Sequence, residues 1–256
     1  MFKKSYCFDD VLLMPRYSDI ISRSEIDLSS RDSLKNLHLN LPIVSSPMDT
    51  VTEDEMSSAM ASLGGLGIIH RYNTPNEQAL LVEKCAKESG AKNIGFAVGV
   101  GEDMLERARK CLRSGANVVC VDIAHGDHAL MKHALNVLRN TLGYNIHIMA
   151  GNVATLAGFN NLADWGADSV RVGIGGGSIC STGHGMPTFQ SIIDCSKTDR
   201  DVAIIADGGI RNSGDIVKCI AAGADLVMLG SLLAGANQSP GDDIYVSGEK
   251  RKVYRG

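Results

Sequence analysis

The chain has 256 residues, of which 44% are hydrophobic and 21% charged, and its formal net charge is -4. This length is close to the ~250 residues of a typical (β/α)8 barrel and fits one large domain better than two small ones. The acidic balance argues against a nucleic-acid interface, because such interfaces neutralise phosphates with a basic face. We therefore expect an ordinary globular protein that binds no nucleic acid and whose phosphate ligand, if any, is small.

No apolar run reaches the ~18–20 residues that span a bilayer, and residues 1–6 lack the apolar segment of a signal peptide. We expect a cytoplasmic protein with no membrane partner. The seven cysteines have no paired spacing, so most of them should be reduced thiols. Four occur in helical or apolar strand contexts, where burial is the more frequent state: Cys111, Cys120, Cys195 and Cys219.

Short runs rich in Val, Ile, Ala and Gly alternate with longer amphipathic runs, which is typical of parallel βαβ units. The short runs lack period-2 polarity, as strands buried on both faces do. In chain order they are 42–46, 66–70, 93–98, 117–123, 146–151, 169–174, 202–206 and 226–230. Between them lie predicted helices such as 76–88, 104–114, 128–141 and 213–222. Eight alternating strand–helix units predict a (β/α)8 TIM barrel that forms a single domain over residues 1–256. A doubly wound sheet is the alternative.

A Gly-Ala junction recurs three times between a predicted helix and the strand that follows it. The triplets are Ser-Gly-Ala at 114–116, Trp-Gly-Ala at 165–167 and Ala-Gly-Ala at 222–224. Glycine at such a position tolerates the left-handed conformation that ends many helices. The repetition supports a repeated αβ unit over an irregular fold.

Glycine is also concentrated after the predicted strands, where barrel enzymes place their chemistry. The richest stretches are 175–178, 207–209 and 230–231, of which the last two follow the seventh and eighth strands. Backbone N–H groups in such tight loops can bind a phosphate. The sequence predicts that the three stretches converge on one anion, although three unrelated turns would give the same spacing.

Cys180 follows the first of these glycine-rich stretches by two residues. A thiolate at the barrel mouth, near backbone N–H dipoles, is a candidate nucleophile, although an isolated loop cysteine is more often inert. No Gly-x-Gly-x-x-Gly follows the first strand, so a dinucleotide would have to bind on the loops. No metal-ligand spacing indicates zinc. His125 is a candidate proton carrier or a simple hydrogen-bonding residue.

Six motifs together resemble the IMP dehydrogenase and GMP reductase family over essentially the whole chain. They occur in the family's order and spacing: Phe-Asp-Asp-Val-Leu-Leu at 8–13, Ser-Pro-Met-Asp-Thr-Val-Thr-Glu at 46–53, Gly-Leu-Gly-Ile-Ile-His at 65–70, Gly-Asn-Val-Ala-Thr at 151–155, Gly-Ser-Ile-Cys at 177–180 and Ala-Asp-Gly-Gly-Ile at 206–210. The resemblance implies a purine nucleoside monophosphate as substrate, NAD or NADP as cofactor and a homotetramer.

The resemblance also implies roles for individual residues. Cys180 would attack purine C2, with Thr182 as the family's catalytic threonine, while hydride passes between that carbon and the nicotinamide. The implied substrate-binding residues are Ser46, Met48, Ser178, Asp207, Gly208, Gly209, Gly230, Ser231 and Tyr254. The implied cofactor-binding residues are Asp122, Asn152 and Arg171, and the carbonyls of Gly175, Gly177 and Cys180 would hold a monovalent cation such as K+.

The two branches of the family remain open. Many dehydrogenases of the family insert a CBS module after the second strand. Here the chain runs from residue 73 directly into a predicted helix, and GMP reductases lack the module as well. In contrast, the motifs at 46–49, 239–241 and 254–256 resemble the dehydrogenase branch, and the loop at 181–187 is shorter than in either branch. The printed sequence ends at Gly256, where family members continue into a flap whose arginine activates water.

These features give three candidate functions. The first is NAD-dependent oxidation of IMP to XMP through a covalent Cys180 thioimidate, and the second is NADPH-dependent deamination of GMP to IMP. The third is a nucleotide-binding barrel with little turnover. We expect hydride transfer from the residues that are present, whereas hydrolysis of the intermediate in the family depends on the flap.

Overall fold

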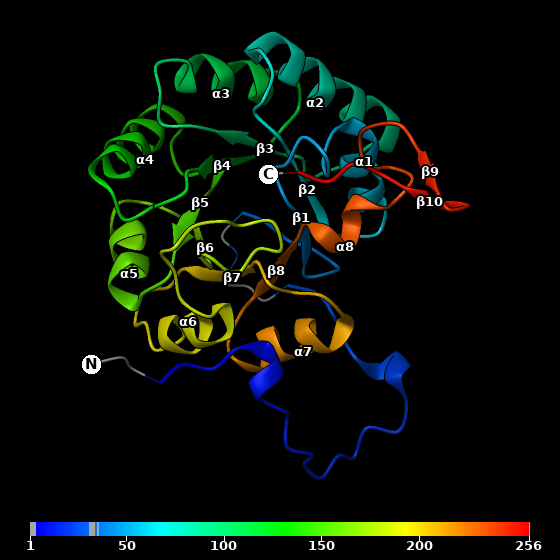
Figure 1. Ribbon diagram of the computed structural model, residues 1–256. Coiled ribbons are helices and arrows are strands. Elements are labelled where there is room, and N and C mark those ends of the chain that lie inside the picture. The colour runs from blue at the N-terminus through cyan, green and yellow to red at the C-terminus, as the bar shows by residue number, and fades with distance from the viewer. Residues whose placement is uncertain (1–3, 31–33, 35, 256) are drawn as a thin grey trace.

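A closed barrel of eight parallel strands, with a helix after each strand, forms the body of the protein (Figure 1). The computed structural model describes residues 4–30, 34 and 36–255. Neighbouring strands pair in sequence order and β1 pairs with β8, which closes the barrel. The predicted (β/α)8 TIM barrel is therefore confirmed.

The strands are β1 (Ile43–Ser45), β2 (Leu66–Ile69), β3 (Gly95–Val98), β4 (Val118–Asp122), β5 (His147–Val153), β6 (Ser169–Val172), β7 (Ala203–Asp207) and β8 (Leu226–Leu229). The helices are α1 (Asp54–Ser62), α2 (Pro75–Ser89), α3 (Met104–Arg113), α4 (Ala129–Leu142), α5 (Leu156–Asp164), α6 (Thr188–Cys195), α7 (Ser213–Ala221) and α8 (Ser231–Ala234). Residues 70–74 connect β2 directly to α2, so no module is inserted there.

Each strand is buried on both faces because it belongs to two cores. In β4, Val118 and Cys120 join the cluster inside the barrel, whereas Val119 and Val121 pack in the larger cluster that includes the helices. All four side chains are fully buried. This double burial explains why the strand sequences lack polar alternation.

The three Gly-Ala junctions end helices as predicted. Gly115, Gly166 and Gly223 have φ angles of +111°, +106° and +110°, which L-residues rarely adopt. At Gly223 a Cβ would also lie 2.6 Å from the Cβ of Ser196. The repeated junction is therefore a backbone requirement of the αβ unit.

The segment before β1 contacts the barrel at its start and then extends away from it (Figure 1). It begins with the 3-10 helix η1 (Phe8–Asp10), whose Phe8 ring packs on Phe189 at 5.7 Å and whose Phe8 carbonyl accepts a hydrogen bond from Lys218. Beyond η1, the apolar side chains of Leu12 and Tyr17 are more than nine-tenths exposed. A second 3-10 helix, η2 (Arg23–Glu25), follows.

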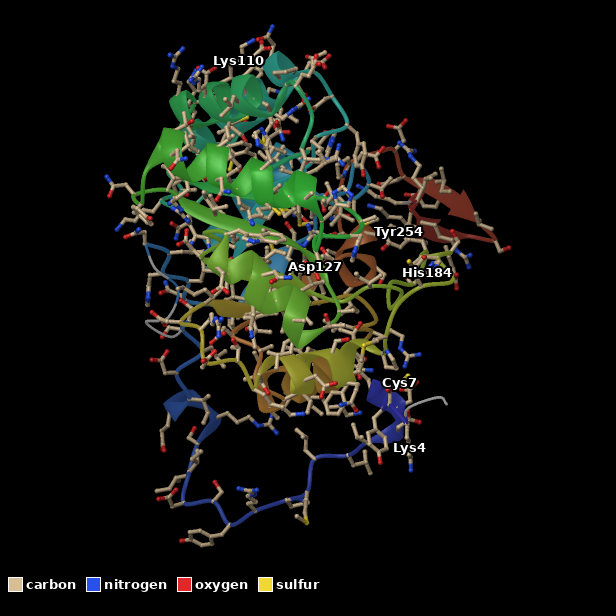
Figure 2. The ribbon with its side chains drawn as sticks, turned by 90° about the vertical axis from the view of Figure 1, so that its left-hand side faces the viewer. Lys4, Cys7, Lys110, Asp127, His184 and Tyr254 are labelled. Carbon is tan, nitrogen blue, oxygen red and sulfur yellow. The ribbon has the colours of Figure 1, made fainter. Side chains whose placement is uncertain are left out.

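The C-terminal part of the chain adds an antiparallel hairpin of β9 (Ile244–Val246) and β10 (Glu249–Arg251). Tyr254 follows this hairpin and lies on the same side of the molecule as His184, which belongs to the loop after β6 (Figure 2). None of the helices in the described part of the chain combines the length and apolar character needed to cross a membrane.

Candidate functional site

Two adjacent cavities open at the carboxyl ends of the strands and share five lining residues. We call them the Tyr254 cavity, of about 410 Å³, and the Asp122 cavity, of about 460 Å³. The shared residues are Gly177, Cys180, Thr182, Asp207 and Gly208. An exposed thiol thus lies where a ligand in one cavity would meet a ligand in the other.

Apart from the five shared residues, the predicted nucleotide-binding and cofactor-binding residues line different cavities. The Tyr254 cavity is lined by Ser46, Met48, Ser178, Asp207, Gly208, Gly209, Gly230, Ser231 and Tyr254. The Asp122 cavity is lined by Asp122, Asn152, Arg171, Gly175 and Gly177. The structure therefore brings the residues suggested for nucleotide, cofactor and cation into one continuous mouth, while Gly256 lies outside the described residues.

The loop that carries Cys180 is held at its base and turned sharply at its tip. The N–H of Met186 donates to the carbonyl of Ile174, and the N–H of Cys180 donates to the carbonyl of Gly177, both at 3.1 Å. Gly175 has φ +87°, and a Cβ there would lie 3.1 Å from the carbonyl oxygen of His184. The glycine run thus allows a tight loop that directs the thiol toward both cavities.

The phosphate-binding candidates form a surface made largely of backbone. Gly208 and Gly209 have φ angles of +94° and +79°, and a Cβ on Gly209 would lie 3.0 Å from the carbonyl oxygen of Gly176. A Cβ on Gly230 would lie 3.1 Å from Ser46 Oγ and 3.1 Å from Tyr254 Oη. The predicted convergence of three glycine-rich stretches is observed, and side chains larger than glycine would obstruct it.

Ser46 offers this cavity an unused polar group. Its side-chain oxygen is buried and has no hydrogen-bond partner among the described residues. The nearby Thr52 hydroxyl donates instead to the Ser46 carbonyl and to Ser45 Oγ, at 2.7 and 2.9 Å. A buried hydroxyl without a partner costs about 1–3 kcal/mol, so a polar ligand group that bonds to it would remove that cost.

Asp207 lies between the cavities and keeps one oxygen free. Its Oδ2 accepts from Asn152 Nδ2 at 2.7 Å and from Arg171 Nη2 at 2.9 Å. Its Oδ1 accepts no hydrogen bond from a described residue. A carboxylate held through one oxygen presents the other as an acceptor for a hydroxyl group.

Asn152 reaches this position because the β5–β6 ladder is irregular. Pairing runs from Gly151↔Arg171 to Val153↔Val172, so Asn152 is left without a register partner. A bulge of this kind redirects a side chain. The Asn152 amide then donates to both the Gly173 carbonyl and Asp207.

Arg171 lies beneath the mouth, between the two carboxylates. Its Nη1 donates to Asp122 Oδ1 at 2.6 Å, while Nε and Nη2 donate to Asp207 Oδ2 at 3.2 and 2.9 Å. Burial lowers the pKa of Arg171, but the negative charges of Asp207 and Asp122 outweigh it, and the pKa lies well above its ordinary value. The guanidinium is thus a permanent cation whose donors are engaged with protein groups.

Arg71 was not assigned a role from the sequence, yet it lines the Asp122 cavity. Its Nη2 donates to the Asp122 carbonyl at 3.2 Å, and its Nε lies 3.7 Å from Asp122 Oδ2. That Nε is buried and forms no hydrogen bond with the described residues. The available signal was a charged residue close behind a buried strand, next to His70, at the end where barrels place their chemistry.

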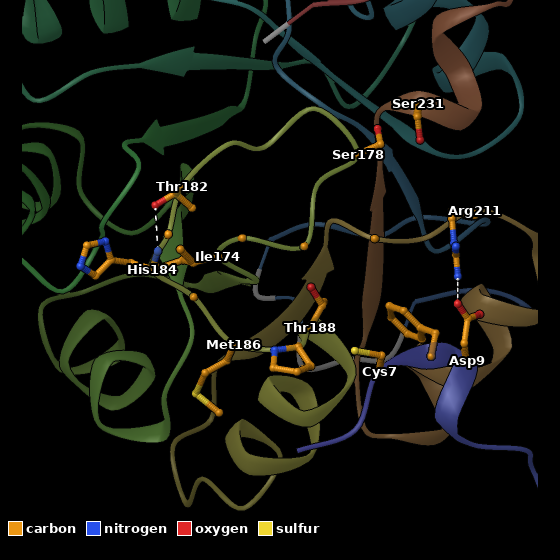
Figure 3. Close-up of a pocket in the computed structure, with 17 residues that line it drawn as sticks. Cys7, Asp9, Ile174, Ser178, Thr182, His184, Met186, Thr188, Arg211 and Ser231 are labelled. Atoms are coloured by element: carbon orange, nitrogen blue, oxygen red, sulfur yellow. Dashed lines mark hydrogen bonds and ion pairs between the residues drawn. The ribbon is translucent and has the colours of Figure 1, made fainter. Parts of the chain in front are cut away.

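A third cavity, of about 670 Å³, includes the residues that follow Cys180 and part of the N-terminal segment (Figure 3). Cys7 and the ion pair of Arg211 with Asp9 line it, and the Thr182 hydroxyl accepts from the N–H of His184 at 3.2 Å. His125 is exposed and lines none of these cavities. Over the described residues, no cluster of three or more His, Cys, Asp or Glu could hold a metal ion.

Fold and site together define a (β/α)8-barrel protein with a two-part mouth and an accessible thiol at the junction. Residues 5–256 match the IMP dehydrogenase / GMP reductase domain. The chain therefore belongs to this family of oxidoreductases, as its motifs predicted.

Curated relatives include both branches. An inosine-5'-monophosphate dehydrogenase of Nitrosopumilus maritimus is 33% identical, over all of this chain and 80% of the relative. One from Cryptosporidium parvum is 36% identical, over 99% of this chain and 74% of the relative. A GMP reductase of Leishmania major is 30% identical, over 97% of this chain and 78% of the relative. The first alignment extends over 385 positions, so that relative carries residues that this chain of 256 lacks.

Proposed function

We propose that this protein oxidises IMP to XMP with NAD as the hydride acceptor, through a covalent bond between Cys180 and the purine. The observation that carries the proposal is the position of Cys180, which lines both cavities. A nucleotide in the Tyr254 cavity and a nicotinamide in the Asp122 cavity would meet at its thiol. The dehydrogenase names of several relatives support this branch.

In the proposed reaction, the sulfur of Cys180 bonds to C2 of the purine, and hydride leaves that carbon. The oxidised nicotinamide supplies the acceptor for the hydride. Water then adds to C2, the carbon–sulfur bond breaks, and XMP leaves while the thiolate is restored and one proton is released. Covalent catalysis of this kind divides one difficult step into two easier ones.

The nucleotide would be held mainly by uncharged groups around the Tyr254 cavity. Ser178, Gly209 and Ser231 would bind the phosphate through N–H and hydroxyl donors, and Asp207 Oδ1 would accept from the ribose hydroxyls. The unpartnered Ser46 hydroxyl would gain a bond to the nucleotide.

The residues around the Asp122 cavity fit a nicotinamide dinucleotide. Asp122 Oδ2 has an ion-pair contact with Arg71 but no hydrogen bond from a described residue, so it can accept from a ribose. Asn152 and Arg171 also line this cavity and would bind the cofactor, and their side-chain donors hold the neighbouring carboxylates in place. Thr182, exposed and next to the thiol in the loop, would assist proton transfer during hydrolysis.

Deamination of GMP to IMP with reduced NADP is the second candidate. It is favoured by the direct connection of β2 to α2 through residues 70–74 and by the relatives named GMP reductase. We also propose K+ at the carbonyls of Gly175, Gly177 and Cys180, a homotetramer, a cytoplasmic location and a single catalytic domain. The cation and the homotetramer rest on the family resemblance, whereas the location and the single domain rest on the composition and length of the chain.

The decisive experiment mixes the protein with IMP and NAD, and separately with GMP and reduced NADP, while nicotinamide absorbance is followed on a rapid-mixing instrument. We expect at least one equivalent of reduced cofactor per Cys180 with IMP. Intact-mass spectrometry of quenched protein should show a bound purine nucleotide that is absent from Cys180→Ala.

The other outcomes are equally specific. Consumption of reduced NADP with GMP, accompanied by ammonia, would replace the dehydrogenase assignment by the reductase. Nucleotide binding without a change in absorbance in either direction would identify a binding protein with little turnover.

A further inference from the structure

Arg171 joins the nucleotide side of the mouth to the cofactor side by pairing with a carboxylate on each. Both carboxylates that it touches are largely buried, with side-chain exposures of 18% for Asp122 and 15% for Asp207. The Arg171 side chain itself is 7% exposed. Solvent therefore screens these three charges weakly, and each depends on its neighbours.

The geometry uses the shape of the guanidinium group. One edge, Nε and Nη2, faces Asp207, and Nη1 faces Asp122, so the two carboxylates are fixed relative to one another. Lysine could not reproduce this arrangement because its ammonium is a single point of charge. Gly151 pairs with Arg171 across β5 and β6, and this position requires glycine because a Cβ there would lie 2.6 Å from Arg171 Cβ.

Each carboxylate bonds to Arg171 through one of its two oxygens. Asp207 Oδ1 has no hydrogen-bond partner among the described residues, and Asp122 Oδ2 has only the Arg71 ion-pair contact at 3.7 Å. Arg171 therefore helps to fix both of these oxygens, and Asn152 adds a second contact for Asp207.

We propose that Arg171 is a positioning residue that couples nucleotide binding to cofactor binding by holding Asp207 and Asp122 on one guanidinium. The proposal rests on the proposed function for the identity of the two ligands. Without the cation, two largely buried carboxylates would repel each other, and only the Asn152 hydrogen bond would still orient Asp207. Nucleotide binding would therefore weaken although Asp122 lies outside the Tyr254 cavity. Arg71 would offset only part of the charge, because it contacts Asp122 and forms no ion pair with Asp207 in the described part of the chain.

The test is a set of four full-length proteins: wild type, Arg171→Met, Asp122→Asn and the double variant Arg171→Met/Asp122→Asn. Isothermal calorimetry with IMP and GMP measures nucleotide affinity, and thermal melting confirms folding. We expect Arg171→Met to weaken nucleotide binding by about tenfold or more. Asp122→Asn alone should change it by less than about threefold while raising the KM for the cofactor, because Asp122 lies outside the Tyr254 cavity.

The double variant separates charge coupling from packing. Replacing Asp122 by a neutral amide removes the repulsion in the Arg171→Met background, so nucleotide affinity should recover by at least about threefold over Arg171→Met alone. A merely structural role for Arg171 would give no recovery. If Arg171→Met fails to fold, the same comparison between Arg171→Gln and Arg171→Gln/Asp122→Asn decides the question, because glutamine also removes the charge.

Two results would overturn the coupling. One is wild-type nucleotide affinity in folded Arg171→Met, and the other is a folded double variant that binds no better than its parent. In both cases wild-type protein still binds the nucleotide, so the proposed function is unaffected. If wild type binds neither IMP nor GMP, the proposed function fails and the coupling fails with it.

Discussion

The two cavities of the mouth differ in the kinds of groups that line them. The Tyr254 cavity is lined by glycines, small hydroxyl side chains such as Ser46 and Ser231, and apolar groups, and Asp207 contributes its one charged side chain among the lining residues. The Asp122 cavity depends on charged side chains, with Asp122 and Arg171 in one ion-pair network. Binding in the Tyr254 cavity should therefore weaken when a side chain is added at a glycine. Binding in the Asp122 cavity should weaken when a charge is removed.

Removal of the group shared by both halves should have the largest effect. We expect Cys180→Ala to lower turnover by at least about a thousandfold, as loss of a nucleophile does in other enzymes, while nucleotide binding survives. Steady-state absorbance assays and calorimetry check the two parts. Cys7→Ala, which removes the other exposed thiol, is the control and should retain turnover. Substantial activity in Cys180→Ala would exclude the covalent mechanism.

Asp207 tests whether the nucleotide side also depends on charge. Asp207→Ala should weaken nucleotide binding by about 1.5–3 kcal/mol, the value of a hydrogen bond to a charged group. The measurement is calorimetry with IMP on protein shown by thermal melting to be folded. Unchanged affinity would mean that the ribose lies elsewhere.

Gly209 tests the backbone character of the same side. Gly209→Ala should destabilise the protein by about 1–2 kcal/mol, because φ +79° is unfavourable for an L-residue, and should weaken nucleotide binding because the loop must move away from Gly176. Thermal melting and calorimetry measure the two effects. Gly235→Ala is a matched control, since φ is -90° and no atom lies within 4 Å of its added Cβ. Equal behaviour of the two variants would contradict the backbone argument.

The smallest expected effect concerns Cys120, whose sulfur accepts a contact from Arg171 Nη1 at 3.5 Å. Burial, opposed by the charge of Arg171, raises the pKa of Cys120 to about 12 from 9.0. The unfolded chain therefore loses this proton first, and the stability that the neutral buried thiol contributes is present below pH 9 and declines as pH rises toward 12.

For one thiol this decline is about 1 kcal/mol between pH 9 and 10. Denaturant unfolding at both pH values should show a correspondingly shallower loss in Cys120→Ala than in wild type. The other buried thiols with raised pKa values, Cys111, Cys195 and Cys219, remain in both proteins and cancel from the comparison. An equal loss of unfolding free energy in the two proteins between pH 9 and 10 would refute the raised pKa of Cys120.

Much of the site could be predicted because motif residues lie at the carboxyl ends of strands. In a parallel barrel the carboxyl ends of all strands meet at one face. Once eight strand–helix units were recognised, Asp122, Asn152 and Asp207 had to lie at the same mouth. Arg71 was missed because no residue near it in sequence shows its partner. Asp122 is far along the chain, and their contact depends on the order of strands around the barrel.

The sequence by itself determined the barrel, the glycine-rich loops and the exposed position of Cys180. These are consequences of local rules: buried parallel strands are continuously apolar, and tight loops require glycine. Only the tertiary structure decided that Arg171 lies beneath the mouth, with its donors engaged by two carboxylates from other strands. Charge pairing across a closed sheet depends on register and on the β5 irregularity at Asn152, and neither is encoded in the spacing of residues along the chain.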